Sequence, residues 1–296
     1  MIKSISQQLF IATSIIAMSL ASLTVQAQSS VWKVSKGNDH IFIGGTVHLL
    51  PVSEFPLPKE FNQAYSKSDS IVLETKLPDA SDTDFQMKMM QQMTYGQGQT
   101  ISDFISIKTK QKLSQYISSL GINLAMLEHF KPGFLMTMLA QFEAQKAQLS
   151  GEGVDVFYSK KASRDNKSIA YLESVEFQLD MISNMGIGDE ERFIKSNIRQ
   201  MEDFEQMFLA VLKAWRVGDE YQLNTLAIGP MKEDPKTLKQ LLTDRNKNWI
   251  PHIERMFADT VKSSDKEFVL VGVAHLVGDK SVLALLKAKG YWIEKM

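Results

Sequence analysis

The sequence predicts an α/β fold in which two related β-α-β halves share one sheet and a helical insertion covers the site at its edge. Three features of the 296-residue chain lead to this prediction. Short apolar runs are bounded by turn residues, which is typical of strands buried on both faces of a parallel sheet. Helical periodicity fills the long stretches between these runs. A strand, a Gly-x-x-His motif, a helix and a strand follow one another near both ends of the chain.

Residues 1–27 have the three-part layout of a secretory signal peptide. Lys3 is the only charged residue in this segment, an apolar stretch occupies residues 9–23, and small residues precede a cut after Ala27. The apolar stretch is shorter than the roughly 20 residues that cross a bilayer. We therefore expect cleavage after Ala27, a periplasmic or secreted protein with no membrane anchor, and one domain over residues 28–296.

The composition argues against several classes of protein. The absence of cysteine excludes a disulfide scaffold, thiolate metal sites and cysteine nucleophiles. A net charge of −1 gives no electrostatic basis for binding nucleic acid or an anionic membrane. The zincin, nucleophile-elbow, Walker A and dinucleotide-binding motifs are also absent, so those classes have no local support.

The first half begins with a predicted β-hairpin, whose strands cover residues 31–34 and 41–43. The second strand runs directly into the Gly45-x-x-His48 motif. A helix is predicted over residues 59–68, and the buried strand after it ends on the carboxylate of Glu74.

A helical insertion is predicted over approximately residues 80–150. It contains a methionine-rich segment at residues 84–93 and helical patterns at residues 102–119 and 133–146. Methionines at helical spacing could hold Cu(I) or contact haem, but they more often form an adaptable core or contact surface. After the insertion, a predicted strand ends on Glu173, and helical pattern then continues to Phe257.

The second half repeats the order of elements in the first. The most hydrophobic strand, residues 267–273, runs into His275, and a helix and a final strand at residues 291–293 follow. Aligning Gly45 with Gly272 also aligns His48 with His275. Right-handed crossovers would place both imidazoles at the same carboxyl edge of the sheet, where open α/β sheets have their sites.

The residues at this edge suit several kinds of chemistry. Two imidazoles with Glu74 form an acceptable ligand set for Mn²⁺, Co²⁺ or Zn²⁺. Each carboxylate could instead act as a general base, orient a histidine, or simply end a strand in solvent. Glu173 could complete the coordination, and Asp155 is a weaker candidate for the same role. Arg245 could hold a substrate carboxylate or an oxyanion, or could lie on a solvated helix face.

Several segments together resemble the TraB/GumN family, which is related to the Tiki metalloproteases. These segments are GGTVHLLP, VLVGVAHLVG, AYSKSDSIVLE ending at Glu74, Gly153-x-Asp155, residues 172–174, Arg216-x-Gly218-Asp219, Arg245-Asn246 and LLKAKGYWIE. The resemblance implies an α/β fold in which the two Gly-x-x-His motifs face each other. Tiki members use Mn²⁺ or Co²⁺ at a site with two histidines and a glutamate. The resemblance implies that the matching residues in this sequence are His48, His275 and Glu74.

The sequence therefore predicts an exported metal-dependent hydrolase, preferably a peptidase acting on a peptide or protein substrate. A divalent ion would be held by His48, His275 and Glu74, and the candidate catalytic residues are Glu74, Glu173 and Arg245. Two alternatives stay open. One is a non-catalytic periplasmic protein that binds haem, metal or peptide. The other is a metal-free esterase in which the histidine and glutamate activate water directly.

Overall fold

The computed structural model describes residues 29–76, 78, 81–96, 98–257 and 266–296. The predicted signal peptide, residues 1–27, lies outside the described residues. Within the described ranges, no helix is both long enough and apolar enough to cross a membrane.

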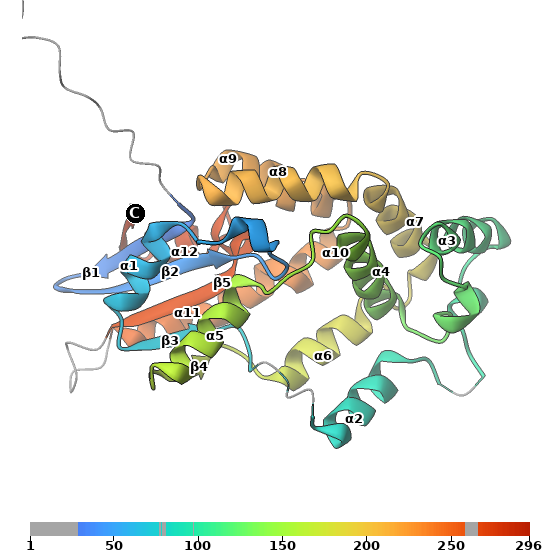
Figure 1. Ribbon diagram of the computed structural model, residues 1–296, viewed down its shortest axis with the longest axis horizontal. Helices are drawn as coiled ribbons and strands as arrows, with labels where there is room; N and C mark the ends of the chain where they lie inside the picture. The colour runs from blue at the N-terminus through green and yellow to red at the C-terminus, as the bar shows by residue number, and fades with distance from the viewer. Residues whose placement is uncertain (1–28, 77, 79–80, 97, 258–265) are drawn as a thin grey trace, which may run out of the picture.

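A mixed sheet of six strands in the order β4-β3-β5-β2-β1-β6 forms the centre of the molecule (Figure 1). The strands are β1 (Val31–Lys36), β2 (Asp39–Thr46), β3 (Ser70–Leu73), β4 (Ser168–Tyr171), β5 (Glu267–Gly272) and β6 (Trp292–Lys295). Neighbouring strands from β4 to β2 are parallel, whereas β1 is antiparallel to both β2 and β6. The predicted α/β class is therefore confirmed.

Helices occupy most of the remaining described chain. They are α1 (Lys59–Ser66), α2 (Thr83–Met93), α3 (Ile107–Ser119), α4 (Pro132–Lys146), α5 (Val154–Arg164), α6 (Val175–Asn184), α7 (Glu190–Met201), α8 (Phe204–Arg216), α9 (Glu220–Leu223), α10 (Pro235–Leu238), α11 (Asp244–Met256) and α12 (Val282–Ala288). Short 3-10 turns are found at Val52–Glu54, Ile101–Asp103, Leu124–Met126, Pro230–Glu233 and Val273–Leu276. Asn224–Ile228 and Lys239–Thr243 are π-helical.

The two predicted halves share the sheet, as β2-α1-β3 and β5-α12-β6. Their equivalent strands β2 and β5 are parallel neighbours, with Gly45 opposite Val271 and Thr46 opposite Gly272. Both Gly-x-x-His segments consequently leave the sheet from the same edge, next to each other.

Both faces of the sheet are covered, which explains the unbroken apolar runs. Phe42 and Phe268 point to the face that holds α1, α5 and Trp215 of α8. Ile43 and Val269, each one residue further along its strand, point to the opposite face with α11 and α12. The central strands β2, β3 and β5 therefore bury most of their side chains and hold their carboxyl ends in fixed positions.

A separate helical layer lies beyond the carboxyl edge of the sheet and has its own apolar core (Figure 1). Its members include Leu113 of α3, Leu135 of α4 and Phe193 of α7. Helices α2 to α4 come from the segment that was predicted as an insertion, whereas α6 and α7 come from the later helical stretch. The layer that faces the site is thus assembled from two separate parts of the chain.

Candidate active site

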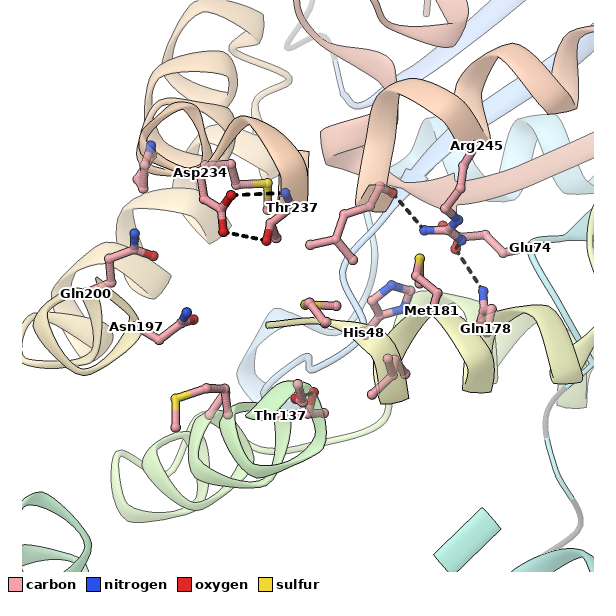
Figure 2. A pocket seen from close by; sticks show the side chains of 18 of the residues that line it. His48, Glu74, Thr137, Gln178, Met181, Asn197, Gln200, Asp234, Thr237 and Arg245 are labelled. Carbon is pink, nitrogen blue, oxygen red and sulfur yellow. Dashed lines mark hydrogen bonds and ion pairs between the residues drawn. The ribbon is translucent and has the colours of Figure 1, made fainter. Parts of the chain in front are cut away.

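A cavity of about 600 Å³ lies between the carboxyl edge of the sheet and this helical layer (Figure 2). Its floor is formed by residues at the ends of β2 and β3, including His48 and Glu74. Its walls come from α4, α6, α7 and the segment 230–241. The volume is in the usual range for small-molecule and peptide pockets.

The three residues predicted to share a site converge on one point beside Gly272. A Cβ atom at this glycine would lie 3.3 Å from Oε1 of Glu74, 3.5 Å from Cδ2 of His275 and 3.6 Å from Nε2 of His48. A Cβ at position 272 would be in tight contact with Glu74 and in ordinary contact with both imidazoles, so all three groups border the same small space beside the glycine.

His48 follows β2 directly and is oriented by α5. Its Nδ1 lies 3.2 Å from Oδ2 of Asp155, in the first turn of that helix. Gly153 permits this approach, since a Cβ there would lie 2.4 Å from the carbonyl oxygen of His48. The His48 side chain remains 63% exposed through the cavity. Its Nδ1 is therefore engaged while its Nε2 is directed to the point beside Gly272.

The surroundings of His48 favour its protonated form. Enclosure by the cavity walls lowers its pKa, but the hydrogen bond and charge of Asp155, with a smaller contribution from Glu74, outweigh this and raise the pKa to about 9. At neutral pH the ring is thus an imidazolium paired with a carboxylate.

The guanidinium of Arg245 lies at the centre of the buried side of the site, where the residue is 5% exposed. Its Nε donates to Glu173 at 3.0 Å, and its Nη1 donates to the carbonyl of Leu241 and to Nε2 of His275, both at 3.1 Å. Its Nη2 donates to Glu74 and Glu173. All five N–H groups of the arginine are therefore in use.

Glu74 and Glu173 lie side by side because their strands are paired. The backbone N–H of Glu173 donates to the carbonyl of Glu74 at 2.9 Å. The side chain of Gln178 bridges the two carboxylates, at 3.4 Å from Glu74 and 2.9 Å from Glu173. Trp249 Nε1 donates to Glu173 at 3.0 Å. Two carboxylates and one arginine thus form a buried, hydrogen-bonded cluster.

Glu74 is held in its ionised form. Burial raises its pKa, but the charges of Arg245 and His48 and the N–H of Gly272, 2.7 Å from Oε1, together lower the pKa below its ordinary value. A carboxylate stabilised in this way is a weak base.

His275 has the opposite environment to His48. It is 3% exposed, and its Nδ1 lies 2.5 Å from Oδ1 of Asn246. Arginine can only donate, so Nε2 of His275 accepts from Arg245 and Nδ1 carries the proton. The carbonyl of Lys280, which accepts from Nδ2 of Asn246 at 2.9 Å, fixes the amide in the required orientation. Burial, aided by the charges of Arg245 and His48, lowers the pKa of His275 and keeps the ring neutral.

This arrangement does not fit a divalent ion held jointly by His48, Glu74 and His275. Both nitrogens of His275 are engaged by Arg245 and Asn246, and Arg245 also covers one oxygen of Glu74. A cationic guanidinium at this place would repel a second cation. Among the described residues, no group of three or more His, Asp or Glu side chains is placed to hold a metal ion.

Three buried oxygens at the floor of the cavity are without a hydrogen-bond partner in the described part of the chain. They are Oγ1 of Thr46, Oγ1 of Thr75 and Oδ1 of Asp155. Buried polar atoms are nearly always paired in folded proteins, so these oxygens mark a place where a water or ligand would complete the hydrogen bonding.

Sequence reasoning identified the charged residues of the site but not its neutral ones. Thr46 is the last residue of β2, and Thr75 follows Glu74 after β3, so their closeness to strand ends could have indicated them. Gln178 and Met181 had no detectable signal, because they reach the site only through the packing of α6. The methionine-rich helix α2 does not supply a residue to the cavity lining.

Fold and site together define an α/β protein with two Gly-x-x-His motifs, a glutamate and a buried arginine at one sheet edge. The chain belongs to the TraB/PrgY/gumN family, whose family model matches residues 30–295. This result confirms the resemblance drawn from the motifs, and it covers nearly the whole chain. No curated protein and no solved structure matches the sequence.

Proposed function

We propose that the protein is a hydrolase in which His48, paired with Asp155, activates water to attack the carbonyl carbon of a peptide substrate. One observation carries this proposal. The ring of His48 has one nitrogen on Asp155 and the other at the cavity floor, which is the geometry of a general base with its orienting carboxylate.

In the proposed reaction, Nε2 of His48 takes a proton from water as the water oxygen bonds to the carbonyl carbon. The carbonyl π electrons move to its oxygen, and Asp155 stabilises the imidazolium that forms. On collapse, the carbon–nitrogen bond breaks and the imidazolium gives its proton to the leaving nitrogen. The free base is the active form, so turnover should rise about tenfold per pH unit below the pKa of His48.

The developing oxyanion needs donors that are not already engaged. Arg245 has no spare N–H, so in this proposal it is a positioning residue that holds Glu74 and His275. The buried hydroxyls of Thr46 and Thr75, which have no partner among the described residues, are the donors that we assign to this oxyanion. Pre-oriented donors at an oxyanion contribute substantially to catalysis.

The metal-dependent peptidase expected from the sequence is the second candidate, and the convergence of both histidines and Glu74 beside Gly272 favours it. The arrangement of Arg245 opposes it. The same experiment separates the two candidates, because a metal centre requires both histidines whereas the proposed base requires only His48.

The test incubates the purified protein with a library of capped peptides and with p-nitrophenyl esters, and follows cleavage by mass spectrometry and absorbance. Chelator-resistant peptide cleavage that is lost in His48→Ala supports the proposal. Stoichiometric Mn²⁺, Co²⁺ or Zn²⁺ binding lost in both His48→Ala and His275→Ala would replace it with the metal-dependent reaction. Cleavage of esters alone would indicate an esterase. Saturable binding of haem or peptide without turnover would indicate a binding protein.

We also propose that the protein acts outside the cytoplasm, because residues 1–27 have the composition of a signal peptide. Cell fractionation and N-terminal sequencing of the purified protein test this point. An N-terminus at Gln28 in the periplasmic or secreted fraction is the expected result. A retained Met1 in the cytoplasmic fraction would contradict it.

A further inference from the structure

The walls of the cavity are rich in methionine. Met136 of α4, Met181 of α6, Met185 directly after α6, Met201 of α7 and Met231 of the segment 230–241 all line it, and we call these five side chains the methionine wall. They come from four separate elements, so the helical layer gathers them at one place. Met136 and Met185 are buried, whereas the other three are partly exposed.

Methionine gives such a wall particular properties. Its side chain is unbranched and flexible, and its thioether is polarisable, so it adapts to apolar groups of different shape. The wall is not a simple extension of the protein core, because it faces a cavity of about 600 Å³. An apolar group that fills this cavity would be taken out of water, and the burial would favour binding in proportion to its area.

The methionine wall itself has no charged group that could bind a charged side chain of a substrate. Among the described residues that line the cavity, three charged ones, Glu74, Asp155 and Arg245, lie at the floor with His48, and the fourth is Asp234. Figure 2 shows Asp234 on the side of the cavity away from Arg245. Asp234 is paired with Arg192 at 3.2 Å and accepts a hydrogen bond from Thr237 at 2.7 Å. None of the described residues that line the cavity is a lysine, and no cation belongs to the methionine wall, so the wall has no group to hold a carboxylate or a phosphate.

Polar neutral side chains lie on the side of the cavity away from the floor. Figure 2 shows Asn197 and Gln200 of α7 there, with Thr137 of α4 nearby. Amide side chains can both donate and accept hydrogen bonds, which suits the main-chain amides of a peptide. The cavity therefore combines an apolar wall with groups that match an uncharged peptide backbone.

We propose that the methionine wall is the specificity pocket of this site, and that it binds a large, uncharged apolar side chain of an internal peptide segment. This inference rests on the proposed hydrolase function. Met181 of α6 lines the same cavity as His48, and in this proposal it is the wall residue that limits how large a side chain fits (Figure 2). The substrate is thus cleaved within its chain, beside a residue such as Leu, Met or Phe.

The experiment measures binding separately from turnover. Calorimetry on the His48→Ala variant uses capped peptides that differ at one position, which carries Ala, Asp, Lys, Leu, Met or Phe. Peptides with Leu, Met or Phe are expected to bind at least about tenfold more tightly than the Ala peptide, and the Asp and Lys peptides more weakly still. Equal affinities across the series would overturn the inference.

Substitutions in the wall give a second test. Met181→Ala should weaken binding of the Leu peptide, and Met181→Phe should lower the affinity for the Phe peptide more than that for the Ala peptide. Met87→Ala is the matched control, because Met87 is 61% exposed on α2 and does not line the cavity. An effect of Met87→Ala as large as that of Met181→Ala would contradict the assignment.

The outcomes distinguish this inference from the proposed function. If the unsubstituted protein binds apolar peptides selectively but does not cleave them, the hydrolase proposal fails and the methionine wall stands as a binding pocket. If the protein cleaves peptides without preference for apolar side chains, the hydrolase proposal stands and the specificity pocket is rejected. Tighter binding of long-chain acyl esters than of any peptide would overturn the peptide assignment.

Discussion

The two Gly-x-x-His segments end adjacent parallel strands, yet their histidines have opposite properties. His48 is 63% exposed, is paired with Asp155 and has a raised pKa. His275 is buried between Arg245 and Asn246 and has a lowered pKa. The repeated motif fixes where each imidazole lies, and the elements packed on it determine whether the ring carries a proton. One histidine is therefore suited to proton transfer and the other to holding an arginine.

The largest effect is expected from replacing Arg245, which lies at the centre of the buried cluster around His275. Arg245→Met leaves Glu74 and Glu173 buried without their cation, which should reduce the free energy of unfolding by about 3–5 kcal/mol. Urea unfolding followed by circular dichroism measures it. Arg255→Met is the control, because Arg255 is exposed on the same helix and contacts His252. Equal stability of the two variants would show that the buried cluster contributes nothing.

Replacing each histidine by glutamine should separate the two roles. His48→Gln is expected to lower kcat/KM by about 10²–10⁴-fold with little change in stability, because it removes the base. His275→Gln is expected to reduce the free energy of unfolding by about 1–3 kcal/mol, because it disturbs partners buried with it. Parallel activity and unfolding measurements on both variants test this. Equal losses of activity with unchanged stability in both would mean that the histidines act as one centre.

Asp155→Asn should make His48 more like an ordinary histidine. Removing the carboxylate takes away the main interaction that raises the pKa of His48, so the pKa should fall from about 9 towards or below 6.5. The break in the pH profile of kcat/KM, and the titration of the imidazole by NMR, should move down together.

Asp165→Asn is the matched control for that change, because Asp165 accepts a hydrogen bond from Tyr65 far from the cavity.

The stability of the unsubstituted protein should also depend on pH through the pair of His48 and Asp155. The pKa of His48 is raised in the folded state, so its protonation stabilises the folded state fully below pH 6.5. This contribution is lost as the pH rises through about 9. A pH profile that Asp155→Asn leaves in place would show that His48 is not the titrating group.

The charged residues and their common edge were predictable from the sequence, and their connections were not. Strand-ending Glu74 and the repeated histidine motif indicated one site, because parallel strands bring their carboxyl ends together. Arg245 was identified as a candidate, but its engagement with both glutamates and His275 depends on where α11 crosses the sheet. The methionine wall was not predictable at all, since its members are brought together only by the packing of several helices. The local sequence pattern is enough to predict the strands, whereas the pocket depends on packing between helices that are far apart in the sequence.

The smallest effect is expected from Thr46→Val, which keeps the shape of the side chain and removes a buried hydroxyl that has no partner among the residues that the structure describes. A loss of about tenfold in kcat, with KM and stability unchanged, would assign the hydroxyl to the oxyanion. Thr225→Val is the control, because its hydroxyl bonds to the carbonyl of Tyr221 on the surface. A gain in stability with no change in kcat would instead mean that the Thr46 hydroxyl serves no ligand.

The position of β5 has a consequence for how the chain reaches this structure. β5 lies between β3 and β2, although it is formed by residues 267–272 near the end of the sequence. Until these residues have been synthesised, β1 can pair only with β2, and β3 only with β4. The two pairs become one sheet, and His275 joins Glu74, once the residues from 267 onward have been synthesised. A ribosome-bound chain that stops before residue 267 should therefore remain open to proteases and to the export machinery.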